Sequence, residues 1–144
     1  MEIRKINDIR PEDAAAVDRA FDGIEPCRIA CCNWAAEYPY APEVTFRMFH
    51  TGDYLMLRFD VAERYTAARV TEDNGRVWTD SCVEFFIAPD QGLYYNFETT
   101  CIGRLLLGAR KSRTEAEHAS AETLGGIPVS YTHLRAHETS AHLV

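Results

Sequence analysis

Residues 76–104, RVWTDSCVEFFIAPDQGLYYNFETTCIGR, decide the fold that we expect of this chain. Residues 82–88 suit an extended strand that is apolar on both sides except at Glu84. Residues 89–92, PDQG, have the composition of a turn, and residues 94–100 again suit a strand. The stretch therefore predicts an antiparallel hairpin that carries polar side chains at selected positions.

Strand patterns and turn residues recur along the rest of the chain. Residues 11–21 instead suit a helix, with Pro11 at its start and a face formed by Ala14, Ala15, Val17 and Phe21. The other extended segments are expected at residues 1–6, 27–34, 43–50, 54–61, 65–70 and 104–110. Residues 111–120 are expected to form a loop. Many short strands beside one short N-terminal helix predict an all-β fold, an antiparallel β-sandwich of jelly-roll or immunoglobulin-like type.

The hairpin stretch also carries a family resemblance. WTDSCVEFFIAP at residues 78–89, YYNFE at 94–98 and IG at 102–103 resemble carbohydrate-binding module family 9 and its relatives in gut bacteria. CCNWAAEYPYAPEVTFRMFHTGDYLMLRF, TEDNGRVWTD and ARKSRTEAEHAS are also similar to successive segments of that family, so the resemblance covers about residues 24–127. It implies a β-sandwich that binds the end of a sugar chain against an aromatic ring.

Composition and charge are those of one soluble domain. The chain has 144 residues, 47% of them hydrophobic and 26% charged, which suffices for a single core. A net charge of −7 argues against nucleic acid or an anionic membrane surface as a partner, because either would favour a basic patch. A neutral partner, such as a mono- or oligosaccharide, is compatible with this charge.

The sequence shows neither a membrane span nor a signal peptide. No stretch approaches the roughly 20 apolar residues of a span, and residues 1–10, MEIRKINDIR, lack the apolar core of a signal peptide. We therefore expect a cytoplasmic chain as written, or an extracytoplasmic one if a leader precedes Met1. The odd number of cysteines predicts reduced, mostly buried thiols at Cys27, Cys31, Cys32, Cys82 and Cys101.

Trp78 and Glu84 are the first candidate binding residues. An indole ring offers a flat apolar face to the C–H groups of a pyranose, and the alternative for Trp78 is a core tryptophan. Glu84 is the one ionisable side chain inside an apolar strand, and its carboxylate can accept hydrogen bonds from two sugar hydroxyls. The alternative is an outward-facing residue or an ion-pair partner of Arg69 or Arg104. The family resemblance implies that Glu84 binds sugar.

Asn96, on the neighbouring strand, completes the predicted carbohydrate-binding set, because its amide both donates and accepts hydrogen bonds. An arginine that the resemblance implies near this strand has no counterpart, since Tyr94 and Tyr95 occupy the local positions. Trp34 is the other possible stacking surface. It closes an apolar segment, so core packing is the prediction for it.

Residues 129–144 are expected to lie outside the domain, which would span residues 1–128. VSYTHLRAHET, residues 129–139, is what one reading frame of a common transposon adapter for DNA libraries encodes. We interpret residues 129–144 as translated adapter sequence that follows a C-terminally truncated, and therefore incomplete, β-sandwich. THLRAHETS shows no strand alternation, and the spacing of His133 and His137 is interpreted as accidental rather than as a metal site.

No cofactor, metal site or catalytic centre is predicted. GxSxG, P-loop, CxxC and HExxH patterns are absent, and Glu84 with Glu98 does not by itself define a glycosidase pair. Glu72, Asp73 and Asn74 suit an ordinary turn more than a calcium site, although the resemblance implies that structural calcium is possible.

The leading prediction is non-catalytic carbohydrate binding, by a domain that belongs to or accompanies a glycoside hydrolase system. Two alternatives stay open. One is a structural or accessory sandwich domain without a ligand. The other is a haem-binding redox module, prompted by related sandwiches that carry a cytochrome, with Met48, His50 and Met56 as conceivable axial ligands.

Overall fold

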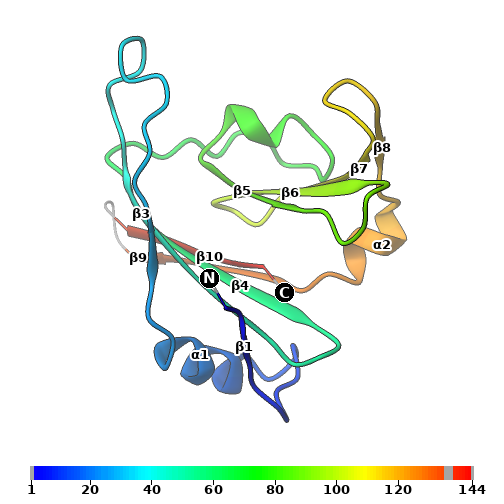
Figure 1. Ribbon diagram of the computed structural model, residues 1–144. Helices are drawn as coiled ribbons and strands as arrows, with labels where there is room; N and C mark the ends of the chain where they lie inside the picture. The colour runs from blue at the N-terminus through cyan, green and yellow to red at the C-terminus, as the bar shows by residue number, and fades with distance from the viewer. Residues whose placement is uncertain (1, 135–137, 144) are drawn as a thin grey trace. The chain divides into compact units, whose positions relative to one another are not determined.

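The structure, a computed structural model, describes the backbone of residues 2–134 and 138–143 and the side chains of residues 2–131. It divides into two compact units, Met1–Tyr65 with Pro128–Val144, and Thr66–Ile127. Each unit contains one β-sheet, and Figure 1 labels the elements.

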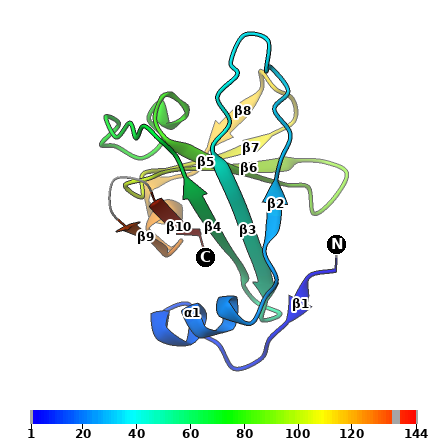
Figure 2. The same cartoon turned by 90° about the vertical axis from the view of Figure 1, so that its left-hand side faces the viewer.

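The first unit holds a six-stranded sheet and one helix. The strand order is β1-β3-β4-β10-β9, with β2 also paired to β3, and Figure 2 shows β2, β3 and β4 side by side. Neighbouring strands are antiparallel except for the pair of β1 and β3. The elements are β1 (Arg4–Lys5), α1 (Ala14–Asp22), β2 (Cys27–Ile29), β3 (Glu43–His50), β4 (Leu55–Ala62), β9 (Val129–Leu134) and β10 (Glu138–Leu143).

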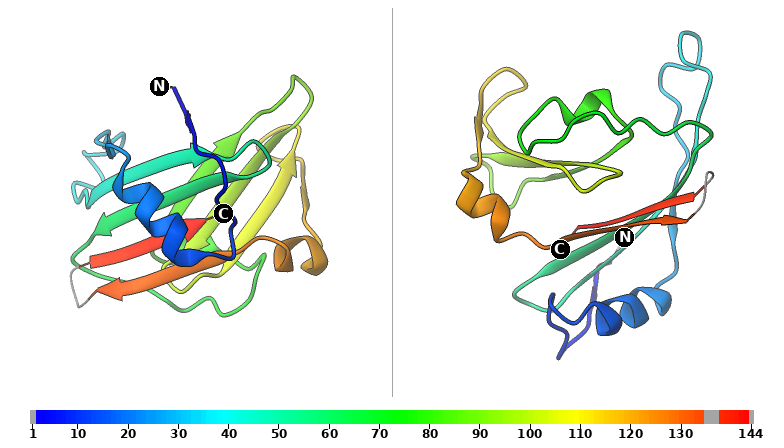
Figure 3. Two further views of the ribbon diagram at one scale, coloured as in Figure 1. Left: turned by 90° about the horizontal axis from the view of Figure 1, so that it is seen from below. Right: turned by 180° about the vertical axis from the view of Figure 1, so that it is seen from behind.

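Helix α1 lies against one face of this sheet (Figure 3). Asp13 caps its N-terminus by accepting a hydrogen bond from the backbone N–H of Ala16 at 3.0 Å. Val17 and Phe21 are buried with Phe49 and Met56 of the β3–β4 hairpin. The Phe21 and Phe49 rings meet edge to face, with centroids 4.9 Å apart. The predicted helix is confirmed, but its expected face was too wide, because Ala14 and Ala15 are exposed.

The β3–β4 hairpin, predicted from alternation, is confirmed, and one face of it carries a cluster of paired charges. Arg47 forms a short ion pair with Asp60 and donates from Nε to the backbone carbonyl of Ile24 at 3.0 Å. Arg58 donates from Nε to the same Asp60 carboxylate at 3.0 Å and lies 3.6 Å from Asp22. We call Asp22, Arg47, Arg58 and Asp60 the closed network.

The second unit holds an antiparallel sheet of order β5-β6-β7-β8, so the hairpin predicted around residues 89–92 is confirmed. Its elements are η1 (Val77–Thr79), β5 (Cys82–Ile87), β6 (Tyr94–Thr100), β7 (Leu105–Arg110), β8 (Ala116–His118) and α2 (Ala121–Gly125). The prediction of a loop for residues 111–120 was wrong at β8, which pairs with β7, and α2 was not predicted.

Two predicted strands are wrong or too long. Residues 65–70 form no strand, because the backbone N–H groups of Arg69 and Val70 donate to the Asp80 carboxylate. The segment expected at residues 27–34 pairs with β3 only over β2, after which the chain turns.

Strands within residues 129–144 were not predicted, because THLRAHETS shows no strand alternation. The backbone of β10 pairs antiparallel with β4, from Thr139 opposite Val61 to Leu143 opposite Leu57, and β9 pairs with β10. Main-chain groups on the free side of β4 can pair with any extended segment, whatever its side-chain pattern. Residues 135–137 and 144 of this tail, and with them His137, lie outside the described residues. The adapter origin and the truncation stay predictions.

Candidate functional site

The sheet of the second unit places four polar side chains on one face. Glu84 of β5 lies opposite Glu98 of β6, and Asn96, two residues from Glu98, lies opposite Gly108 of β7. Arg110 follows Gly108 by two residues on the same strand. Because alternate residues of a strand and their direct partners share a face, we name Glu84, Asn96, Glu98 and Arg110 the polar row.

Asn96 is the centre of the polar row. Its side chain is 1% exposed. Its Nδ2 donates to Glu98 Oε1 at 2.7 Å, and its Oδ1 accepts from Arg110 Nε at 2.7 Å. A Cβ on Gly108 would lie only 2.6 Å from Asn96 Oδ1, so the missing side chain at Gly108 makes room for this arrangement. Asn96 therefore holds Glu98 and Arg110 in place.

Hydrogen-bonding capacity is left over in the polar row. Glu98 is 7% exposed, and its Oε2 has no hydrogen-bond partner among the described residues. Burial is the main cause that raises the pKa of Glu98, repulsion by Glu84 adds to it, and Arg110 and Asn96 oppose it. Glu84 itself is exposed. The row thus presents an accessible carboxylate beside a second, poorly satisfied one.

Exposed aromatic rings also occur in this unit, on β5 and in η1. Phe86 lies opposite Asn96 and is exposed, and its ring centroid is 6.3 Å from that of Tyr94. Trp78, in η1, is 51% exposed, with the Arg76 guanidinium carbon 5.9 Å from its ring centroid. The alternative of a core tryptophan is therefore wrong for Trp78. η1 packs against β5 and β6 through its buried first residue, Val77.

The sequence missed Arg110 as a member of this site. Arg110 comes from β7, outside the local positions where the arginine was expected, and only the β6–β7 register brings it beside Asn96. The pairing register between two strands cannot be read from a short sequence motif. The alternative pairing of Glu84 with Arg69 or Arg104 does not occur among the described ion pairs, in which Arg104 lies 3.8 Å from Asp73.

The turn at residues 72–75 is tied to β7. Asp73 Oδ1 accepts from the backbone N–H of Leu105 at 3.1 Å. Asn74 Oδ1 accepts from the Leu107 N–H at 3.3 Å, and its Nδ2 donates to the Ala119 carbonyl at 2.9 Å. Asn74 adopts φ 55°, as a turn residue before Gly75 readily does. These side-chain oxygens accept hydrogen bonds from backbone N–H groups of β7. Structural calcium stays a prediction.

The geometry of the β3–β4 hairpin removes Met56 from the ligand set of the haem alternative. Met48 lies opposite Leu57, and Met56 opposite Phe49, so alternation puts Met56 on the other face of the hairpin from Met48 and His50. Met56 is fully buried in the cluster under α1. One iron therefore cannot bind Met56 together with either of the other two.

Comparison with known proteins shows the family of this chain. A profile of carbohydrate-binding family 9 matches residues 15–141. The chain belongs to carbohydrate-binding family 9. Its structure is similar to the crystal structure of a candidate carbohydrate-binding protein from Bacteroides uniformis ATCC 8492, with 37% sequence identity and a TM-score of 0.87. The match covers 99% of this chain and 69% of that chain.

Membership of family 9 confirms two predictions. The fold class is all-β, an antiparallel β-sandwich with a short N-terminal helix, and the function class is non-catalytic carbohydrate binding. No curated protein sequence matches this chain. Within the described residues, no helix has the length and apolar character needed to cross a membrane.

Proposed function

We propose that this family 9 domain holds a terminal sugar with its second unit, stacking the ring on Trp78 and binding hydroxyls with Glu84. The half-exposed indole of Trp78 supports the stacking, because C–H groups of a pyranose can cover a flat apolar face. Glu84 is exposed and acts as an acceptor for sugar hydroxyls. The single observation that carries the proposal is the pair of exposed groups in this unit, the half-exposed Trp78 ring and the exposed Glu84 carboxylate of the polar row.

Asn96 takes a different role from a direct sugar ligand. Its amide nitrogen and oxygen are both occupied, by Glu98 and Arg110, and its burial leaves almost no surface for a hydroxyl. We therefore assign Asn96 as a positioning residue. The guanidinium of Arg110, which also donates to the Arg113 carbonyl at 3.2 Å, retains further N–H donors for sugar hydroxyls.

The two tryptophans of the chain make a direct test possible. In a Trp34→Phe variant, Trp78 is the single indole, and titration with mono- and oligosaccharides should change its fluorescence saturably. Glu84→Gln in this background should weaken binding at least tenfold, whereas Tyr54→Phe, a change at an exposed turn residue of the first unit, should not. If Trp78 fluorescence does not respond to any sugar that binds the domain, the stacking proposal is wrong.

An accessory sandwich without a ligand is the competing function. It is supported by the hydrogen bonds of Asn96, whose amide nitrogen and oxygen both bind other side chains of the domain, as they would in a purely structural network. A broad glycan array separates the two, because the accessory function predicts no signal for any glycan.

A further inference from the structure

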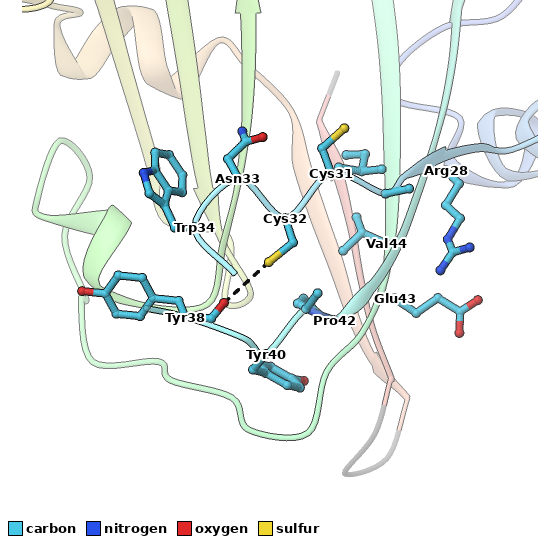
Figure 4. Close-up of a pocket in the computed structure, with 13 residues that line it drawn as sticks. Arg28, Cys31, Cys32, Asn33, Trp34, Tyr38, Tyr40, Pro42, Glu43 and Val44 are labelled. Carbon is cyan, nitrogen blue, oxygen red and sulfur yellow. Dashed lines mark hydrogen bonds between the residues drawn. The ribbon is translucent and has the colours of Figure 1, made fainter. Parts of the chain in front are cut away.

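A second feature suited to a ligand lies in the first unit, in the loop that joins β2 to β3. Residues 28–34, 38 and 40–44 line an open pocket of about 390 Å³, within the size range of small-molecule sites. Pairing of Ile29 with Val44 closes the base of the loop. Trp34, Tyr38 and Tyr40 contribute aromatic rings to the pocket, and Figure 4 shows its lining.

The loop holds two of these rings in a fixed relation. The backbone N–H groups of Glu37 and Tyr38 both donate to the Trp34 carbonyl, at 3.0 and 2.7 Å, which closes a single helical turn. Residues four apart on such a turn share a side. Figure 4 shows the rings of Trp34 and Tyr38 projecting to the same side of the loop. The Cys32 thiol donates to the Tyr38 carbonyl at 3.5 Å and ties the two ends of the turn together.

Tyr40 is anchored as well. Its hydroxyl accepts a hydrogen bond from the backbone N–H of Arg64, and the Arg64 guanidinium carbon lies 5.9 Å from its ring centroid. The Tyr65 ring approaches it edge to face at 6.5 Å. These contacts reach across to the chain after β4, so the pocket wall is preformed and its occupation would order few side chains.

The exposure of these rings indicates that they contact a ligand and do not belong to the hydrophobic core. Trp34 is 67% exposed and Tyr38 is 73% exposed, so the prediction that Trp34 packs in the core was wrong. Large apolar surfaces that converge on one place usually mark an interaction site. The amide of Asn33 and the charges of Arg28 and Glu43 also belong to the lining. Flat apolar faces edged by hydrogen-bonding groups match a sugar ring, whose faces are apolar and whose rim carries hydroxyls.

We propose that this pocket is a second carbohydrate-binding site, in which a sugar ring stacks on Trp34 and Tyr38. The inference rests on the proposed function only for its ligand class, because no residue is shared with the site at Trp78. The amide of Asn33, beside Trp34 in Figure 4, supplies a donor and an acceptor for the hydroxyls. The site would give one chain a second place that holds a sugar ring.

The test uses the full chain with a single indole at a time. A Trp78→Phe variant leaves Trp34 as the one reporter, and a Trp34→Phe variant leaves Trp78. Each is titrated with a panel of mono- and oligosaccharides while fluorescence and its quenching by iodide are followed. We expect sugar to shield Trp34 from iodide saturably. Tyr38→Ala in the Trp78→Phe background should weaken this response about tenfold, and Tyr54→Phe should leave it unchanged.

The outcomes separate the two proposals. If Trp78 responds to sugars and Trp34 does not, the pocket proposal is overturned and the proposed function stands. If Trp34 responds and Trp78 does not, the pocket proposal holds and the Trp78 site fails. If Trp34 responds equally with and without Tyr38, the pocket is not the site of contact. Circular dichroism of each variant identifies any loss of signal caused by unfolding.

Discussion

The closed network of the first unit and the polar row of the second unit both place charges on one face of neighbouring antiparallel strands, yet they differ in what they leave unpaired. In the closed network, Asp60 accepts from both Arg47 and Arg58, and Arg58 also lies near Asp22. In the polar row, two carboxylates stand opposite each other.

The guanidinium of the polar row binds an amide rather than either carboxylate. Arg110 donates to Asn96, and Glu98 Oε2 lacks a partner among the described residues. A buried charge that loses its partner costs more free energy than one that keeps it, and an unsatisfied buried polar group costs free energy. We therefore associate the first set of charges with stability and keep recognition by the second set as a proposal.

Deleting residues 129–144 should have the largest effect, because β10 pairs with β4, the strand that carries Arg58 and Asp60. Loss of β10 would leave a row of N–H and C=O groups on β4 without partners. With net contributions of about 0.5–1.5 kcal/mol for each hydrogen bond, we expect the free energy of unfolding to fall by roughly 3 kcal/mol or more. Urea unfolding of the two chains measures this.

The same deletion distinguishes the sequence interpretation from the structure. Translated adapter sequence with no structural role predicts almost the same urea midpoint for both chains. An unchanged midpoint would therefore show that β10 does not contribute to the stability of the sheet in solution.

Asp60→Ala should be the next largest effect. It leaves Arg47 and Arg58, which lie directly opposite each other in the register, without the carboxylate between them. Hydrogen bonds to charged groups contribute about 1.5–3 kcal/mol, and we expect a loss of that size in unfolding free energy. Glu84→Ala, at an exposed carboxylate of the polar row, is the matched control and should change stability by less than about 0.5 kcal/mol. Equal losses would remove the distinction between the two sets.

Much of the fold could be predicted because strand alternation is a local signal. The boundaries of β3 and β6 match the expected segments, and those of β4, β5 and β7 differ by about one residue. One failure came where a side chain accepts hydrogen bonds from the backbone N–H groups that a strand would need. Asp80 takes the N–H groups of residues 69 and 70, so a segment with suitable residues forms no strand.

The candidate site could be predicted only in part, because it depends on register between strands. Trp78 and Glu84 stand out in the sequence as an aromatic residue in a polar turn and a charge in an apolar strand. Arg110 becomes part of the site only through its position opposite Tyr94. Trp34 was misjudged because its apolar neighbours suggested a strand, whereas a turn at residues 34–38 exposes the ring.

Glu98→Gln should produce a smaller, pH-dependent effect. The pKa of Glu98 is raised by burial in the folded protein, so the unfolded chain ionises first as pH rises through the ordinary value of 4.5. The free energy of unfolding of the wild-type protein therefore falls as pH rises from 4.5 to the raised pKa of folded Glu98. Above that pKa the loss of stability stays constant. Glutamine has no such titration, so the variant should gain stability relative to wild type at neutral pH and lose that advantage below about pH 4.

Urea unfolding at a series of pH values measures the difference between the two proteins. Glu84→Gln removes the neighbouring negative charge and should lower the pKa of Glu98. The pH range over which stability is lost should then be narrower. A difference between wild type and Glu98→Gln that stays constant with pH would show that Glu98 is not perturbed, and the polar row would then resemble the closed network.

The smallest effect concerns Cys82, which shares the face of the polar row and reports on its charge. Burial, followed by repulsion from Glu84 and Glu98, raises the pKa of Cys82 to about 12. Glu84→Gln should lower this pKa and speed alkylation of Cys82 at pH 9 by less than about tenfold, since one pKa unit is a tenfold change in thiolate. Mass spectrometry of the peptide that contains Cys82 follows the rate, with exposed Cys31 and Cys32 as internal controls. Asp60→Asn, in the closed network, should leave the Cys82 rate unchanged. An equal acceleration by both variants would mean that loosened structure, rather than the charge of the polar row, controls this thiol.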